Sequence, residues 1–293
     1  MPYGKVSAGL FMPPFSDELR RNGFAVEWAY TKKELRRHLL DDLQVFVIHL
    51  YGEDDEQILC DEVLLLEEMA TEVFNSAKVG PLLADKLATH NAFHDAGALV
   101  PPLSSDHGFV RARQGSGLAA QVEDLPSYVE QENDGFIRNQ FIDTRVRFKD
   151  EAYFTTVRLI CVDDTVLHAY PRARNVDEGN TSVHAKDTPV NAELIEFLHG
   201  ELVVPFEKDF KDIARNLHCV LGHGFFVHDL LIEDGSVFVC ESGFKFDDRA
   251  YWEHIEKIAK KIPSQAPLLP VQDFARRSAR AFLAQCQSIL KRG

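Results

Sequence analysis

The sequence is poor in the features that would place it in a specialised class of protein. Its five cysteines are scattered along 293 residues without a Cys-x-x-Cys pair or a Cys/His cluster, so no cysteine zinc motif is predicted. No apolar run approaches the roughly 18 residues of a membrane helix. No long basic run accompanies the net charge of −14. These absences argue against a membrane-spanning protein and against a nucleic-acid backbone as the main partner.

A signal-peptide core is also missing at the N-terminus, where Pro13 and Pro14 interrupt a short apolar patch. We therefore expect a cytoplasmic protein whose cysteines are mostly small apolar core residues. The length allows two or three modest domains. A hydrophobic content of 45% with 27% charged residues is ordinary for a globular chain.

The N-terminal quarter alternates between strand-like and helix-like patterns. Strands are predicted at 24–30 and 43–51, and helices at 32–40 and 54–75. Alternation of this kind predicts a small parallel α/β domain. Because no Gly-x-Gly-x-x-Gly follows the first strand, a dinucleotide-binding domain is not supported.

The segment 226–248 is predicted to be a β-hairpin with one acid in each arm, Asp229 and Glu241. Ionised carboxylates among apolar neighbours are costly to bury unpaired, so the two acids suggest a shared cation. A three-residue loop, Asp234 to Ser236, would set them opposite each other with Cβ atoms about 5 Å apart. A two-residue Asp-Gly loop would place them on opposite faces. We predict the three-residue turn; the alternative role of either acid is a solvated group at a strand end.

Three polar segments upstream of the hairpin could meet an anion. A short helix begins at Lys86 and stops at Gly97, and a strand with Arg111 leads into a glycine-rich loop. A long polar loop, 171–186, follows a predicted hairpin of two strands. Each feature alone has an ordinary explanation: Lys86 could be a solvated lysine, the glycine-rich loop a flexible turn, and 171–186 a surface loop.

Taken in order, these segments resemble the ATP-grasp superfamily, and within it the RimK-type ribosomal-protein glutamate ligases. The D-alanine–D-alanine ligases are a more distant resemblance. The similarity covers residues 75–245 and lies in the order and spacing of five motifs. These are ADKLATHNAFHDAGALVPP, FVRARQGSG, NQFID, TVRLICVDDTVLHAYPRARNVDEGNTSVHAK and HDLLIEDGSVFVCES.

The resemblance implies an ATP-grasp fold of α/β (α+β) class behind the small N-terminal domain. It suggests boundaries at 1–78 for that domain, 79–145 for a lid subdomain and 146–293 for a C-terminal subdomain. It also implies a site that binds ATP and Mg²⁺. The implied nucleotide contacts are Lys86, Arg111, Gly115 and Ser116 at the phosphates, the hinge Gln140, Phe141 and Ile142 at adenine, Asp143 near the ribose, and Asn180.

The same resemblance assigns roles around the reacting groups. Arg158 and Arg172 would hold a substrate carboxylate or acyl phosphate, and His184 would touch phosphate or substrate. Asp229 and Glu241 would be magnesium ligands. Two positions depart from the family pattern: Gly243 stands where the metal signature has asparagine, and Arg111 stands where the glycine loop has lysine. We expect at least one magnesium position to be weaker than usual.

The function that the resemblance implies is an ATP-dependent carboxylate–amine ligase acting through an acyl phosphate. Its substrates would be ATP, a small-molecule or peptide carboxylate and an amine acceptor, with no nucleic-acid or membrane partner. A homodimer is compatible with the fold. Two alternatives stay open: a kinase that uses the same ATP site, and a divergent non-catalytic protein that serves as a partner or regulator.

Overall fold

The computed structural model describes residues 5–29, 33–34, 46–49, 61–104, 108–114, 119–122, 135–179, 181–184, 187–244 and 268–291. The side chains of 5–9, 61–62 and 119–122 are not among the described atoms. No helix in the described ranges is long and apolar enough to cross a membrane.

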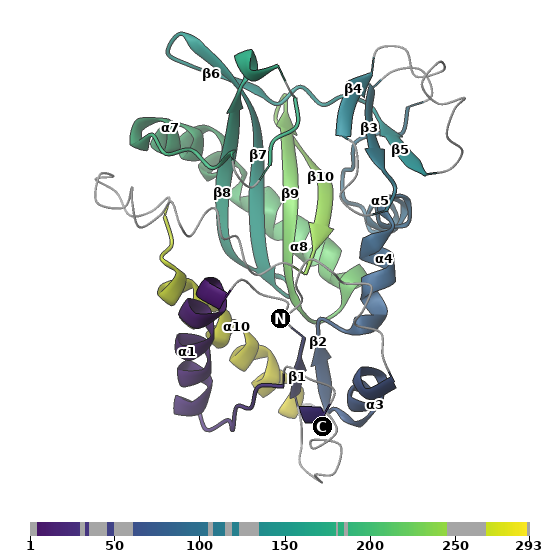
Figure 1. Cartoon of the computed structure of the whole chain (residues 1–293), viewed down its shortest axis with the longest axis vertical. Helices are drawn as coiled ribbons and strands as arrows, with labels where there is room; N and C mark the ends of the chain where they lie inside the picture. Colours follow the sequence, from purple (N-terminus) through teal and green to yellow (C-terminus); the bar gives the residue numbers. More distant parts are fainter. Residues whose placement is uncertain are drawn as a thin grey trace.

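The largest sheet has five antiparallel strands organised around β7 (Glu151–Val162). One edge of β7 pairs with β8 (Thr165–Asn175), while the other pairs with β9 (Phe225–Glu233) and β6 (Arg145–Phe148). The last strand, β10 (Ser236–Gly243), forms a hairpin with β9. This sheet is the core of the molecule in Figure 1.

Two smaller sheets flank it. The first is antiparallel, with β3 (Gly108–Ala112) between β4 (Ala119–Val122) and β5 (Phe136–Asn139). It lies beside the short helices α4 (Gly80–Ala84) and α5 (Lys86–Asp95), at the upper right of Figure 1. The second pairs β1 (Phe46–Ile48) with β2 (Glu72–Phe74) in parallel; a parallel sheet was predicted, but β2 lies where the pattern predicted helix.

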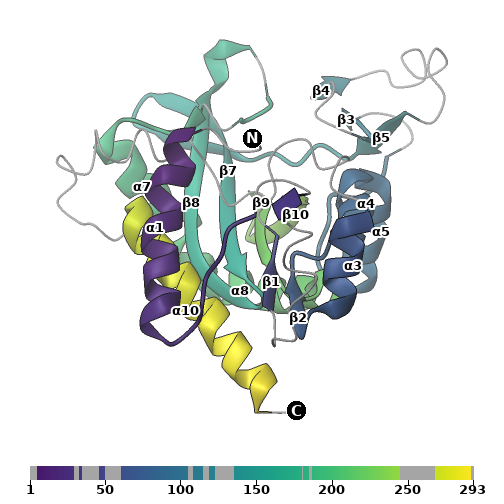
Figure 2. The same cartoon turned by 60° about the horizontal axis from the view of Figure 1, so that its bottom comes forward.

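Helices cover both faces of the large sheet. Because successive side chains of a strand point to opposite faces, β7 contributes to two cores. Val157 and Leu159 pack in the core that contains α7 (Ala192–Leu202) and α8 (Glu207–Leu221). Ile160 packs in the core that contains α1 (Lys5–Arg21) and α10 (Val271–Leu290), which lie side by side in Figures 1 and 2. The described residues also form α3 (Asp61–Met69) and the 3₁₀ turns Ala77–Val79, Val176–Glu178 and Val204–Phe206.

The N-terminal segment differs from its predicted layout. Its helix α1 contains Pro13 and Pro14, and it holds because Phe11, Phe15 and Leu19 form a buried stripe at helical spacing against α10. Residues 24–29 do not form the predicted strand. Instead, Phe24, Val26 and Trp28 pack against the same core, and Trp28 Nε1 donates to Ser16 Oγ at 3.0 Å.

The helix predicted at 32–40 lies largely outside the described residues, and the two predicted elements after it end earlier than expected. Of the strand predicted at 43–51, the structure describes β1 at Phe46–Ile48. The helix predicted at 54–75 ends at Met69, and its last residues form β2 instead. The N-terminal segment also shares its core with α10 from the other end of the chain. The boundaries at 78 and 145 therefore stay predictions.

Candidate functional site

The hairpin of β9 and β10 carries the acid pair. Ser236 pairs directly with Glu233, so the turn between the strands has two residues, Asp234 and Gly235. Both have positive φ, 48° and 79°. Such a turn needs left-handed backbone at both positions, which Asp-Gly supplies. The predicted three-residue turn was therefore wrong.

A β-bulge at Cys240 restores the predicted pairing. The register runs regularly to Val239 opposite Leu230, then shifts by one residue so that Glu241 lies opposite Asp229. An extra residue on one strand moves every later side chain to the other face. The prediction that the two acids lie side by side is confirmed.

Two arginines from the neighbouring strands meet Asp229. Arg158 on β7 is its direct cross-strand partner and binds both carboxylate oxygens, with Nε 2.8 Å from Oδ1 and Nη2 2.7 Å from Oδ2. Arg172 on β8 approaches Oδ1 through Nη1 at 3.7 Å. The side chains of Arg158 and Arg172 are only 11% and 2% exposed, whereas that of Asp229 is 23% exposed. Two cations thus surround one carboxylate on the sheet face.

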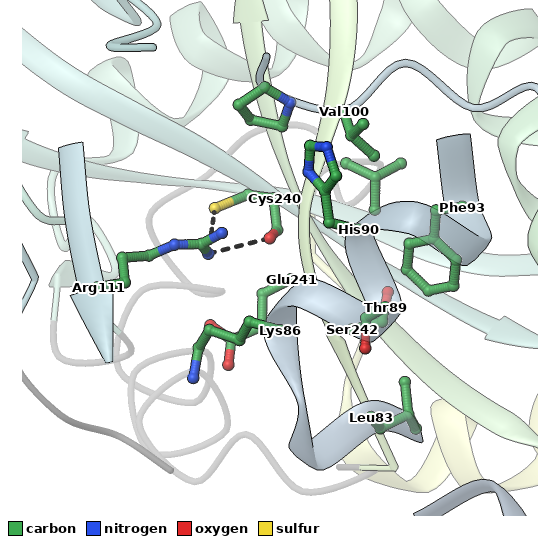
Figure 3. Close-up of a pocket in the computed structure, with 12 residues that line it drawn as sticks. Leu83, Lys86, Thr89, His90, Phe93, Val100, Arg111, Cys240, Glu241 and Ser242 are labelled. Carbon is green, nitrogen blue, oxygen red and sulfur yellow. Dashed lines mark hydrogen bonds between the residues drawn. The ribbon is translucent and has the colours of Figure 1, made fainter. Parts of the chain in front are cut away.

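A pocket next to this cluster joins α5, β3 and β10 (Figure 3). Lys86 and Glu241 lie close together on one side of it, and Arg111 extends across from β3. Burial lowers the pKa of Lys86 below its usual value, and the Glu241 carboxylate is the strongest charge opposing that shift. His90, Thr89 and Cys240 also line the pocket.

Arg111 links the small sheet to the bulge of β10. Its Nη1 donates to the Cys240 carbonyl at 3.0 Å and lies 3.2 Å from the Cys240 thiol, and its Nη2 donates to Asn139 Oδ1 at 3.1 Å. The side chain is 7% exposed. Its Nε is buried and has no hydrogen-bond partner among the described residues. A buried donor of this kind calls for a further acceptor.

Comparison with known proteins identifies the architecture. No protein-family model matches the sequence, and no curated protein matches it. Among solved structures, D-alanine–D-alanine ligase from Bacillus anthracis superposes with a TM-score of 0.56, covering 99% of this chain and 95% of that chain at 12% identity. The chain has the ATP-grasp fold.

Two further structures give the same result. A RimK domain ATP-grasp protein from Sphaerobacter thermophilus has a TM-score of 0.51 at 14% identity, with 96% of this chain and 97% of that chain covered. The ATP-grasp ligase PsnB, solved with a precursor variant, Mg and ADP, has a TM-score of 0.51 at 13% identity, with 94% and 95% covered. The fold that the five motifs predicted is confirmed.

Within this ATP-grasp fold, the hinge residues connect the small sheet to the large one. The Gln140 N–H donates to the Pro102 carbonyl, and the Asp143 N–H donates to the Glu233 carboxylate, so both are already engaged. The Phe141 ring meets Phe154 edge-on, and Ile142 is buried. Hydrogen bonds from Arg145 lower the pKa of Asp143. Adenine recognition by this hinge stays a prediction.

The other predicted residues are either exposed or lie outside the part of the chain that the structure describes. The His184 side chain is exposed, and its backbone N–H donates to Asp187, which also pairs with Arg174 at 3.0 Å. Gly115, Ser116 and Asn180 lie outside the described residues. The structure therefore brings together Arg158, Arg172, Asp229 and Glu241 in one cluster, with Lys86 and Arg111 beside Glu241.

Asp85, which the sequence reasoning did not single out, positions Lys86. Its Oδ1 caps α5 by accepting from the N–H groups of Leu87 and Ala88, at 3.0 and 3.1 Å. Arg113 binds the same carboxylate with two nitrogens, and its carbonyl accepts from the Lys86 N–H at 2.9 Å. An aspartate immediately before a helix was a readable capping signal.

The Asp85 cap predicts a pH-dependent loss of stability. Hydrogen bonds from Arg113 lower the pKa of Asp85 from 3.8 to about 2. A depressed carboxyl pKa contributes stability above pH 4 that is lost as the pH falls toward 2, here about 2 kcal/mol. Urea unfolding of wild type and Asp85→Asn should differ by that amount at pH 6 and converge near pH 2. An equal difference at both pH values would contradict the assignment.

Proposed function

We propose that the chain is an ATP-dependent carboxylate–amine ligase that works through an acyl phosphate. The observation that carries the proposal is the pairing of Asp229 with Glu241 among cationic side chains, on a fold shared with ligases. A carboxylate is a poor electrophile because it is anionic. In the first step its oxygen would bond to the γ-phosphorus while the bond to ADP breaks. In the second, an amine nitrogen would bond to the acyl carbon while phosphate leaves.

Phosphoryl transfer depends mainly on positioning and on neutralising charge, which suits the residues present. We assign Lys86 and Arg111 to the outer phosphates of ATP. The unpartnered Nε of Arg111 supports this assignment, since a phosphate oxygen would satisfy it. We assign Arg158 and Arg172 to the substrate carboxylate or acyl phosphate, because a planar fork binds such anions with two parallel hydrogen bonds.

The donor set of the acid pair fits magnesium. Mg²⁺ is commonly held by one or two carboxylates together with substrate phosphates, and Asp229 and Glu241 supply two on neighbouring strands. Each carboxylate oxygen has two lone pairs, so Asp229 can accept from Arg158 and still offer oxygen to a metal. When bound, the ion would neutralise charge on the phosphates.

The remaining contacts follow from the resemblance. We propose that the hinge from Gln140 to Asp143 meets adenine and ribose, and that Gly115 and Ser116 belong to a loop that covers the phosphates. Asn180 would contact nucleotide, and His184 would donate a hydrogen bond to phosphate. Excluding water matters here because water would hydrolyse the acyl phosphate.

The glycine at position 243 predicts a gain of metal affinity on substitution. Residues 241 and 243 share a strand face, and a side-chain carbon added at Gly243 meets nothing within 4 Å. Gly243→Asn should therefore restore an oxygen ligand and lower the magnesium concentration for half-maximal nucleotide binding about 3- to 10-fold, near 1 kcal/mol. Gly243→Ala is the matched control, and equal behaviour of the two variants would exclude a ligand role.

A non-catalytic role is the second candidate, favoured by two observations. Both oxygens of Asp229 are engaged by Arg158, and no asparagine follows Glu241 at the usual spacing. Isothermal titration with magnesium and ATP separates the candidates, because a non-catalytic protein of this kind would give no binding at millimolar nucleotide.

The activity itself is tested by ADP release from MgATP with pools of carboxylates and amines. A ligase should need both substrates, and added hydroxylamine should trap the acyl phosphate as a hydroxamate. A phosphorylated product that forms without any amine would instead identify a kinase.

A further inference from the structure

Three metal-ligating side chains meet at a place that takes no part in the proposed ATP site. Asp163 lies in the turn between β7 and β8, His218 in the last turn of α8, and His223 between α8 and β9. Each offers one ligand atom, and these atoms lie within 4.8 Å of one another. None of the three lines the pocket of Lys86 and Glu241.

The backbone holds Asp163 in a fixed position. Its φ of 51° places it in the left-handed region of a tight turn, and its side chain is 1% exposed. Oδ1 accepts from the Gly224 N–H at 2.7 Å, and Oδ2 lies 2.7 Å from His223 Nδ1. One oxygen is thus used to fix the turn, while the other faces the histidines.

The His218 imidazole is oriented as that of a metal ligand commonly is. His218 Nδ1 lies 3.0 Å from the Gly222 carbonyl. Metal-ligating histidines commonly donate one ring N–H to such an acceptor, which orients the other nitrogen toward the metal. The His218 and His223 rings lie 5.2 Å apart, and the His223 side chain is 28% exposed, so an ion can reach it from solvent.

We propose that Asp163, His218 and His223 form a site for a divalent transition metal, with zinc as the ion that best suits the donors. Two imidazoles and one carboxylate are a zinc donor set, and three protein ligands leave a fourth position for water. Without a metal, His223 would tie the loop through Asp163 and His218 would cap α8 through the Gly222 carbonyl, but neither contact accounts for two imidazoles meeting at one carboxylate.

The position suggests what the metal does. The Asn75 N–H, directly after β2, donates to the His223 carbonyl at 2.8 Å, and the Asn75 side chain exchanges hydrogen bonds with the backbone of Phe225. Asp163 and His223 therefore lie at the seam where β2 joins the large sheet. A metal that binds the folded chain only would stabilise this seam through binding linkage.

The test is zinc titration of metal-free full-length protein by calorimetry, with excess magnesium present to occupy the acid pair. We expect one zinc per chain and a Tm that rises on zinc addition. His218→Ala should weaken zinc binding at least about 10-fold and abolish the Tm rise. Asp163→Asn should do the same.

Two controls make the result specific. His94→Ala changes a histidine that is 73% exposed and outside the cluster, and should bind zinc as wild type does. Glu241→Gln should also retain the zinc site, because the two sites share no residue. Absence of zinc binding in wild type at tens of micromolar, or unchanged binding in His218→Ala, would overturn the proposal. Circular dichroism on each variant separates lost binding from lost folding.

Discussion

Asp229→Asn is expected to lower magnesium-dependent ADP release by about 10²- to 10³-fold, as loss of a charge-stabilising group at a phosphoryl-transfer site commonly does. The substitution removes one of two predicted metal ligands. It also leaves Arg158 and Arg172 facing the same point without their carboxylate, although both are largely buried. Breaking such a pair from one side costs about 3 kcal/mol of folding stability.

The two effects can be measured separately. Urea unfolding reports the stability loss, and ADP release at saturating magnesium reports the catalytic one. Asp234→Asn is the matched control, because the same exchange at the first residue of the hairpin turn removes a charge while keeping a residue that tolerates positive φ. If Asp229→Asn loses stability but turns over ATP normally, the carboxylate is a structural partner of the arginines and not a metal ligand.

The hairpin shows which structural features could be predicted from the sequence and which could not. The two apolar runs around the turn residues and the acid in each arm predicted two strands and an acid pair, and both are present. Turn length could not be deduced, because Asp-Gly fits a two-residue turn and also lies within a three-residue one. The bulge at Cys240 coincides with a contact from a distant strand: Arg111 donates to the Cys240 carbonyl at the point where the register shifts. Such a contact has no local signal.

The predicted arrangement of the N-terminal segment was wrong for a related reason. Helix α1, which the sequence patterns did not predict, runs through Pro13 and Pro14 because its buried stripe packs on α10, more than 250 positions later in the chain. Tertiary packing overrides local preference when enough apolar surface is buried. The motifs between 75 and 245 predicted the ATP-grasp fold, and the structural comparisons confirm that fold.

In the candidate site, too, some contacts have a local sequence signal and others depend on the assembled sheet. Lys86 and Arg158 were proposed from the order of the motifs. Asp85 holds Lys86 in place, and Asp229 holds Arg158, but the two partners differ in how they could be recognised. Asp85 carried a local capping signal. The pairing of Asp229 with Arg158 needed the register of β7 against β9, which only the assembled sheet defines.

Arg111→Met is expected to weaken ATP binding by about 10- to 100-fold, because a hydrogen bond to a charged group contributes about 1.5–3 kcal/mol. Methionine keeps much of the side-chain length while removing every donor. The Cys240 carbonyl and Asn139 Oδ1 would each lose the donor that Arg111 supplies, so unfolding in urea should also show a loss of about 1–3 kcal/mol.

Arg111→Lys separates the two roles of this side chain. Lysine keeps the charge that the ATP-grasp glycine loop normally carries, but it has no planar fork with which to bind Asn139 and Cys240 together. We therefore expect Arg111→Lys to retain most of the ATP affinity measured by calorimetry and to lose stability as Arg111→Met does. If both variants bind ATP as wild type does, Arg111 serves only to connect the small sheet to the β10 bulge and does not contact ATP. If both lose binding equally, the fork itself contacts phosphate, and the unpartnered Nε is the group that turns toward it.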